Sequence, residues 1–136
     1  MKTVFADTFF YLALLSEDDA SHRGAVAWAA TKNRYVTTEF VLLEVVDGMS
    51  APGARGIVSQ FLRTLFRNPD TRIVPASSDL LLQGLRLFEQ RPDKGWSLTD
   101  CTSFVVMEHE HLREVLTGDH HFAQAGFLPL LASASS

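Results

Sequence analysis

Four acidic residues occupy positions where the neighbouring sequence gives a charge no obvious partner: Asp7, Glu44, Asp100 and Asp119. An ionised carboxylate among apolar residues is costly unless it is paired or bound to a metal ion. Glu44 is the clearest case, because it is the only polar residue in the segment 40–46. A partner arginine is the alternative explanation for Glu44.

The three aspartates have ordinary structural alternatives. Asp7 precedes an apolar helix-forming segment, which its side chain could cap. Asp100 lies in the first turn of another apolar segment, where a negative charge interacts favourably with the helix dipole. Asp119 follows Gly118 and could be a turn residue. None of the three identifies a functional site by itself.

Together, the four acids form a stronger pattern than any one of them does. Asp7 and Asp119 end predicted strands, while Glu44 and Asp100 belong to predicted helices beside those strands. Because the carboxyl ends of parallel strands meet at one edge of a sheet, we expect all four side chains to converge there. Four carboxylates close together repel one another strongly unless a cation lies among them.

The expected site suits a hard divalent cation. It offers oxygen ligands and no thiolate cluster, which is the ligand set of Mg²⁺ or Mn²⁺. The pattern leaves open whether one ion or two would bind. A bound ion polarises a phosphodiester and generates hydroxide at neutral pH, so phosphodiester hydrolysis is the expected chemistry.

The elements that must position these acids alternate along the chain. Strands are predicted over residues 3–6, 35–38, 71–76, 114–117 and 127–131. Helices are predicted over residues 8–15, 18–31, 39–49 and 56–67, from Ser77 or Ser78 to the loop 91–95, and over residues 98–112. Strands separated by helices form a parallel sheet with helices on both faces, so the fold class is α/β. The strand at 127–131 is expected at the sheet edge, because Pro129 cannot donate a ladder hydrogen bond.

The length of 136 residues predicts one domain over residues 1–131, followed by a flexible tail at 132–136. The single cysteine, Cys101, rules out an internal disulfide and fits a reducing cytosol, so we expect a cytoplasmic protein. The apolar run 9–15 is too short to span a membrane, and no membrane association is expected.

The net charge of −4 does not by itself indicate a nucleic-acid partner. It does not exclude one either, because a metal ion reverses the local sign of an acidic site. Four arginines cluster in one stretch: Arg55, Arg63, Arg67 and Arg72. They form either a solvated helix face or a surface for RNA or a protein partner.

Four stretches of the chain resemble a PIN domain, and together they extend over nearly its whole length. They are VFADT at 4–8, TTEFVLLE at 37–44, WSLTDCTSF at 96–104 and LTGDHHFAQAGF at 116–127. The third and fourth stretches are the most specific to the family. The resemblance implies a PIN-like three-layer α/β/α fold with a central, mainly parallel sheet of four to five strands.

The same resemblance implies that Asp7, Glu44, Asp100 and Asp119 are the catalytic and metal-binding residues. Three further residues match hydroxyl positions near that site, with helix capping as their alternative role: Thr8, Thr99 and Ser103. Compact single-domain PIN proteins resemble the VapC-type toxins of type II toxin–antitoxin systems, which cut structured RNA such as tRNA or rRNA. The resemblance therefore implies an endoribonuclease that uses Mg²⁺, with Mn²⁺ able to substitute, and that forms a homodimer and binds a cognate antitoxin.

Other functions fit the sequence less well. A phosphatase of the Asp-x-Asp type would need an acid where Phe9 stands, and no phosphate-binding glycine loop is present. His120 and His121 adjoin Asp119 and either contact RNA phosphate or only make a loop polar. A non-catalytic PIN-fold binding module and a non-toxin RNA-processing nuclease remain the alternative functions.

Overall fold

The computed structural model describes residues 1–131, and the predicted tail at 132–136 lies outside the described residues. The strands are β1 (Lys2–Ala6), β2 (Asn33–Thr38), β3 (Thr71–Val74), β4 (Glu114–Leu116) and β5 (Leu128–Pro129). The helices are α1 (Thr8–Leu15), α2 (His22–Ala29), α3 (Glu39–Gly48), α4 (Arg55–Phe66), α5 (Ser78–Gln90), α6 (Leu98–His109) and α7 (His120–Gln124). None of the helices within residues 1–131 is both long and apolar enough to span a membrane.

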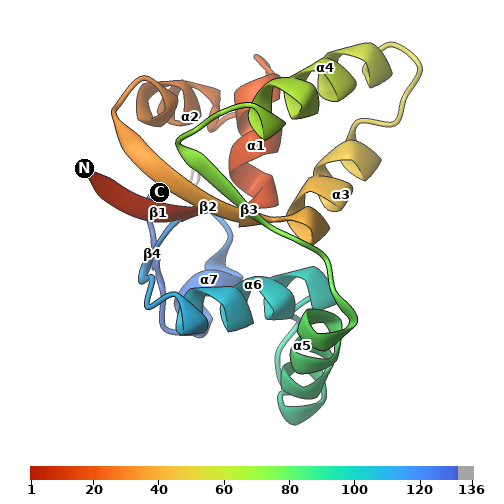
Figure 1. Cartoon of the computed structure of the whole chain (residues 1–136), viewed down its shortest axis with the longest axis vertical. Helices are drawn as coiled ribbons and strands as arrows, with labels where there is room; N and C mark the ends of the chain where they lie inside the picture. The colour runs from red at the N-terminus through yellow and green to blue at the C-terminus, as the bar shows by residue number, and fades with distance from the viewer. Residues whose placement is uncertain (132–136) are drawn as a thin grey trace.

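The five strands form one sheet in the order β3-β2-β1-β4-β5, and every neighbouring pair is parallel (Figure 1). The α/β fold class is confirmed, with a sheet that is wholly rather than mainly parallel. Strand β1 is central, and Val4, Phe5 and Ala6 are completely buried. The chain leaves β1 toward β2 and returns on its other side through β4. Such a switch point is where open parallel sheets usually bind ligands.

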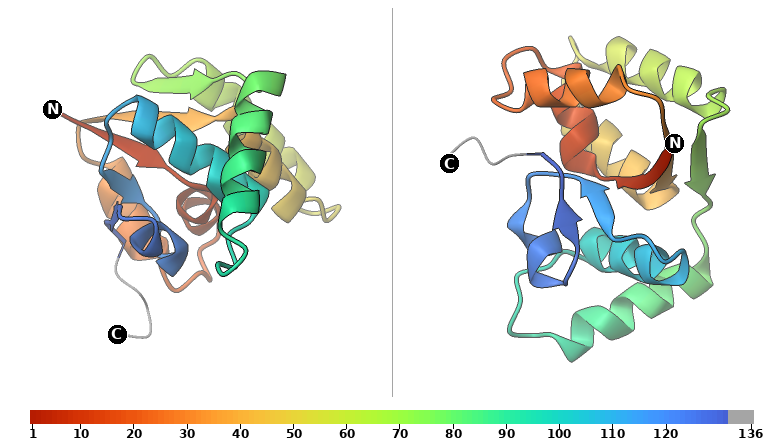
Figure 2. Two further views of the ribbon diagram at one scale, coloured as in Figure 1. Left: turned by 90° about the horizontal axis from the view of Figure 1, so that it is seen from below. Right: turned by 90° about the vertical axis from the view of Figure 1, so that its left-hand side faces the viewer.

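The sheet separates two layers of helices, as expected for a three-layer α/β/α fold. Helices α1, α2, α3 and α4 lie on one side of it, and α5, α6 and α7 lie on the other (Figures 1 and 2). Helices α5 and α6 approach closely at Gly84, where an added Cβ atom would lie 2.6 Å from Cγ2 of Thr102. The absent side chain at Gly84 therefore lets α5 pack directly on α6, which carries Asp100.

An aromatic cluster fixes α6 relative to α7. The ring of Phe104 packs edge-on against Trp96 and Phe122, with centroid distances of 5.0 and 4.9 Å. Phe104 also contacts Phe127 at 5.6 Å. Edge-on pairs of this kind stabilise a core beyond the area that they bury. Both helices that flank the β4 side of the switch point are thus anchored by the same apolar core.

Several predicted boundaries were wrong for local reasons. The second helix begins at His22 rather than 18, because a carboxylate oxygen of Asp19 accepts the backbone N–H of Ser21 and holds a turn there. The helix predicted to reach 112 ends at His109, and His111 adopts a left-handed φ of 57° that turns the chain toward β4. Strand β3 ends at Val74, before a proline that cannot donate to a neighbouring strand.

Candidate metal centre

Asp7 and Asp119 lie on the two sides of the switch point and are linked by one hydroxyl group. The Oγ1 of Thr117 donates to Oδ2 of Asp7 at 2.9 Å and accepts the backbone N–H of Asp119 at 3.1 Å. Thr117 is completely buried, and β1 pairs with β4 in register at Ala6 and Leu116. The sheet itself therefore places Asp7 beside the turn that carries Asp119.

The carboxyl of Asp7 is buried, with 4% of the residue exposed. Its pKa is raised from an ordinary value of 3.8 to about 7, mainly by burial and, to a smaller extent, by like-charge repulsion from the carboxylates of Asp100 and Glu44. The hydrogen bond from Thr117 acts in the opposite direction. Asp7 occupies the position before α1, but its side chain makes no capping hydrogen bond. The capping explanation for Asp7 is therefore wrong.

Asp100 performs the structural role that its position indicated. Its backbone N–H donates to Oγ of Ser97 at 3.0 Å, and its Oδ2 accepts the backbone N–H of Ser97 at 3.1 Å. These two bonds form a capping box at the start of α6. Nδ1 of His121 also lies 3.0 Å from Oδ2 of Asp100. Both hydrogen bonds between the Asp100 carboxylate and the described residues therefore involve Oδ2.

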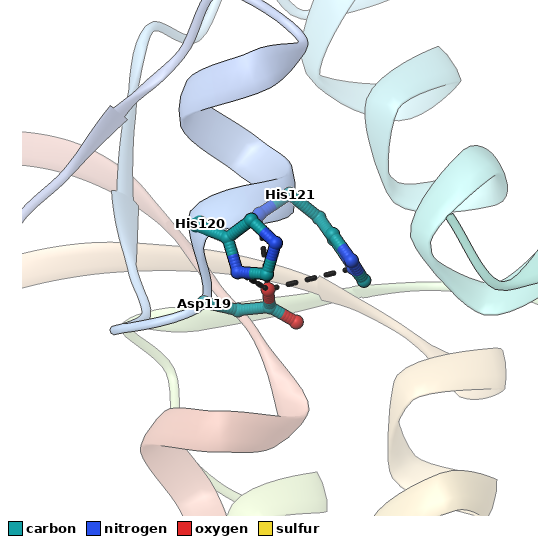
Figure 3. A group of neighbouring side chains, drawn as sticks. All are labelled: Asp119, His120 and His121. Atoms are coloured by element: carbon teal, nitrogen blue, oxygen red, sulfur yellow. Dashed lines mark hydrogen bonds and ion pairs between the residues drawn. The ribbon is translucent and has the colours of Figure 1, made fainter. Parts of the chain in front are cut away.

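Asp119 is the N-cap residue of α7, and its carboxylate faces the imidazole rings of both His120 and His121 (Figure 3). Its Oδ1 accepts the backbone N–H of His121 at 3.0 Å. The Nδ1 atoms of His120 and His121 lie 3.6 and 3.4 Å from the same oxygen. Asp119, His120 and His121 bring three ligand atoms within 4.8 Å of one another, and the four predicted acids form no group that tight in residues 1–131.

Glu44 lies on α3 and is half-buried. No lysine or arginine of the described chain lies within 4.0 Å of its carboxylate, so the partner-arginine explanation is wrong there. Its negative charge instead contributes to the raised pKa of Asp7. Helix α3 is capped by Thr38, whose Oγ1 accepts the backbone N–H of Val41 at 3.0 Å, directly after β2 ends.

Two of the three predicted hydroxyl residues have unusual surroundings. The Oγ1 of Thr8 and the Oγ of Ser103 are buried and have no hydrogen-bond partner among residues 1–131. Thr8 follows Asp7, and Ser103 lies one turn beyond Asp100 on α6. Buried polar atoms without a partner are rare and call for a ligand or ordered water. Thr99 is half-buried, and its carbonyl accepts the hydroxyl of Thr102.

These donors fit a divalent cation. A buried carboxyl under like-charge repulsion from two others is the environment that a cation would stabilise, and the unsatisfied hydroxyls within residues 1–131 belong to the segments that carry Asp7 and Asp100. Sequence reasoning missed Thr117 and gave His121 no structural role. Thr117 could have been found as a polar residue at a strand end. His121 belongs to α7, a five-residue helix too short to have a periodic signal.

A sequence profile of the PIN-domain family matches residues 4–128. Among characterised proteins, the 23S rRNA-specific endonuclease VapC20 of Mycobacterium tuberculosis is 28% identical over 127 residues, which is 92% of this chain and 95% of that protein.

Solved structures show the same fold. The crystal structure of M. tuberculosis VapC20, described as a sarcin–ricin loop cleaving toxin, superposes with a TM-score of 0.85 at 24% identity and covers 94% of this chain and 98% of that one. VapBC2 from Rickettsia felis, solved with a DNA fragment from their promoter, has a TM-score of 0.64 at 16% identity, covering 95% of this chain and 96% of that one. FitAcB from Neisseria gonorrhoeae has a TM-score of 0.64 at 15% identity and covers 99% of both chains.

Proposed function

Because the chain belongs to the PIN-domain family, we propose that it is a divalent-metal-dependent endoribonuclease and the toxin of a toxin–antitoxin pair. The observation that carries the proposal is the burial of the Asp7 carboxyl together with its raised pKa. Its carboxyl is buried at a sheet switch point under repulsion from Asp100 and Glu44, and such strongly shifted groups cluster at functional sites. The similarity to VapC20 over nearly the full length of both proteins supports the same activity.

Four residues would hold Mg²⁺, with Mn²⁺ able to substitute: Asp7, Glu44, Asp100 and Asp119. A bound ion supplies charge stabilisation at the scissile phosphate and makes water a nucleophile at neutral pH. The set spans the β1–α1 junction, α3, α6 and the β4–α7 turn, so the site depends on the whole switch point being folded.

The chain itself contributes positioning. Thr117 holds Oδ2 of Asp7, and Ser97 holds Oδ2 of Asp100 through the capping box. The hydroxyls of Thr8 and Ser103 have no partner among residues 1–131 and are available to donate to a phosphate oxygen or a water molecule; Thr99 lies on the first turn of α6, the helix of Ser103. Preorganised donors of this kind stabilise charge that develops during reaction without reorganising.

The proposed substrate is a structured RNA in the cytoplasm, either rRNA or tRNA. VapC20 is named for 23S rRNA and described as a sarcin–ricin loop cleaving toxin, which makes 23S rRNA the first substrate to test.

The single cysteine, Cys101, is a buried free thiol, as in proteins of a reducing compartment. Of the clustered arginines, Arg72 pairs with Glu110, and Arg55 and Arg63 are exposed on α4.

The proposed protein partners are a cognate antitoxin and a second copy of the chain. Two helices expose large apolar side chains, which supports protein contacts on both: Ile57 and Phe66 on α4, and Leu81, Leu82, Leu85 and Phe88 on α5.

The activity is tested by incubating purified protein with ribosomes and with total RNA, in EDTA and after adding Mg²⁺ or Mn²⁺. We expect cleavage only with the metal, and only in protein that retains Asp7. Asp7→Asn removes one ligand, and Asp18→Asn, at an exposed position, is the matched control. No cleavage of any RNA with either metal would favour the non-catalytic binding module. Cleavage without growth arrest on expression would favour a non-toxin processing nuclease.

A further inference from the structure

We propose that His121 is a nitrogen ligand of this metal centre and gives it a preference for Mn²⁺ over Mg²⁺. The inference rests on the proposed function, because it takes Asp100 and Asp119 as ligands of the same ion. It adds an imidazole to a site otherwise built from carboxylates.

The first support is the convergence of two carboxylates on one ring nitrogen. Nδ1 of His121 lies 3.0 Å from Oδ2 of Asp100 and 3.4 Å from Oδ1 of Asp119. These carboxylates come from different elements, α6 and the turn before α7. A ring nitrogen carries at most one hydrogen, so it cannot make a full hydrogen bond to both oxygens. A cation between the three atoms would satisfy all of them.

The distances also match those between ligands of one ion. A metal–ligand bond of about 2.1 Å places two ligands about 3.0 Å apart at a right angle and about 3.4 Å apart at a tetrahedral angle. The two separations measured from His121 Nδ1 are 3.0 and 3.4 Å. Little rearrangement is therefore needed for Asp100, Asp119 and His121 to share an ion.

The backbone holds the imidazole in this position. The N–H of His121 donates to Oδ1 of Asp119, and the next residue, Phe122, is completely buried in the aromatic cluster. On the far side of the ring, a Cβ atom built on Gly95 would lie 3.8 Å from Nε2. Only 23% of the side chain of His121 is exposed. The Nδ1 edge of the ring thus faces the carboxylates while the loop before α6 lies at the Nε2 edge.

An independent feature lies on the same helix as Asp100. Ser103 is completely buried, and its hydroxyl has no hydrogen-bond partner in residues 1–131. Residues three apart on a helix share a face, so this hydroxyl and the Asp100 carboxylate lie along one side of α6. An unsatisfied buried hydroxyl there points to a further polar group, such as a metal-bound ligand, that residues 1–131 do not supply.

Ligand type then decides which ion is preferred. Mg²⁺ strongly favours oxygen ligands, and imidazole nitrogen is a ligand of the first-row transition ions. An imidazole in a position that a water oxygen would otherwise fill therefore weakens Mg²⁺ binding relative to Mn²⁺. Carboxylates and one imidazole together are compatible with Mn²⁺, which accepts both.

His120 provides a matched control within the same segment. Its Nδ1 lies 3.6 Å from Oδ1 of Asp119, and its ring centroid is 4.5 Å from that of His121 (Figure 3). However, 74% of its side chain is exposed, and no contact to Asp100 within 4.0 Å is found in the described chain. We therefore assign the nitrogen ligand to His121 and not to His120.

The test is pulsed electron paramagnetic resonance of the full-length protein loaded with Mn²⁺. We expect the Mn²⁺ spectrum to show the hyperfine coupling of a directly bound ¹⁴N nucleus. When only histidine is labelled with ¹⁵N, this coupling should change to that of ¹⁵N, which identifies a histidine ligand in the wild-type protein. The coupling should disappear in His121→Gln and persist in His120→Gln. By calorimetry, His121→Gln should weaken Mn²⁺ binding by about tenfold or more and Mg²⁺ binding by much less, so that the preference for Mn²⁺ is lost.

The outcomes separate this inference from the proposed function. Mn²⁺ that binds wild type but not Asp7→Asn, without any histidine nitrogen coupling, would overturn the role of His121 and leave the metal nuclease standing. A coupling that survives in His121→Gln and vanishes in His120→Gln would also overturn it. Mn²⁺ bound equally by wild type and Asp7→Asn would instead contradict the proposed centre itself.

Discussion

Because of Asp7, the unfolding free energy of the metal-free protein should fall as the pH rises. Asp7→Asn is expected to remove this pH-dependent fall in stability. The pKa of Asp7 is about 7 in the folded chain against an ordinary value of 3.8, mainly because the carboxyl is buried. The folded state therefore holds the proton more tightly than the unfolded state does. The stability contributed by the protonated carboxyl is fully present below pH 3.8 and is lost as the pH rises toward 7.

The size of the effect follows from the shift. A difference of about 3 pKa units corresponds to about 4 kcal/mol of unfolding free energy. Most of this difference accrues between pH 4 and pH 8, so wild type should lose about 4 kcal/mol more than Asp7→Asn over that interval. For a domain of this length, the corresponding difference in melting temperature is about 10 °C. Effects of the new amide that do not depend on pH cancel in this comparison.

The assay is urea unfolding of both proteins in EDTA at several pH values. Asp18→Asn serves as the control, because Asp18 is exposed, and its pH dependence should match that of wild type to within about 0.5 kcal/mol. At pH 8, added Mn²⁺ should stabilise wild type more than Asp7→Asn, since a ligand that binds only the folded state stabilises it by mass action. Equal pH dependence in wild type and Asp7→Asn would refute the account of Asp7 as a buried, repelled carboxyl.

Three further perturbations test other parts of the structure. Thr117→Val removes the hydroxyl that lowers the pKa of Asp7, so the loss of metal-free stability should extend to higher pH and RNA cleavage should fall; unchanged titration would show that the hydrogen bond is unimportant. Gly84→Ala places a Cβ atom 2.6 Å from Thr102 and should destabilise the protein by about 1–3 kcal/mol in thermal melts, with partial recovery in combination with Thr102→Ser. In the proposed mechanism, water and not the ribose 2′-hydroxyl attacks phosphorus, so cleavage products should carry 5′-phosphate and 3′-hydroxyl ends by mass spectrometry; cyclic phosphate ends would exclude this route.

The sheet was predictable because strand-forming and helix-forming patterns alternate along the chain. That alternation is enough to place Asp7 and Asp119 at strand ends. It does not predict the strand order β3-β2-β1-β4-β5, which depends on packing between distant segments. The order matters for the site, because it makes β1 and β4 neighbours and allows Thr117 to reach Asp7.

Asp100 illustrates why the sequence could not choose between a cap and a site residue. Both interpretations use the same position in the first turn of a helix. In the structure, the capping box uses Oδ2, and the described residues leave Oδ1 without a bond. Because a carboxylate oxygen has two lone pairs, Oδ2 can accept the capping bond and still face an ion beside His121, and Oδ1 is available as well. The convergence of all four acids stays a prediction. The charges of Asp100 and Glu44 raise the pKa of Asp7, whereas Asp119 is linked to the other acids only through its contacts with Thr117 and His121 within the described residues.

In the proposed metal centre, a proton and a metal ion compete for Asp7, so metal binding is expected to release protons in a pH-dependent way. With a pKa of about 7, Asp7 is about nine-tenths protonated at pH 6 and about one-tenth protonated at pH 8. Titrating Mn²⁺ by calorimetry in buffers of different ionisation enthalpy should give close to one proton per ion from Asp7 at pH 6 and almost none at pH 8. His121→Gln removes any contribution of that imidazole, so the release that remains in this variant belongs to Asp7. Equal release at both pH values would mean that the ion binds without displacing the Asp7 proton, and that the buried carboxyl is not a ligand.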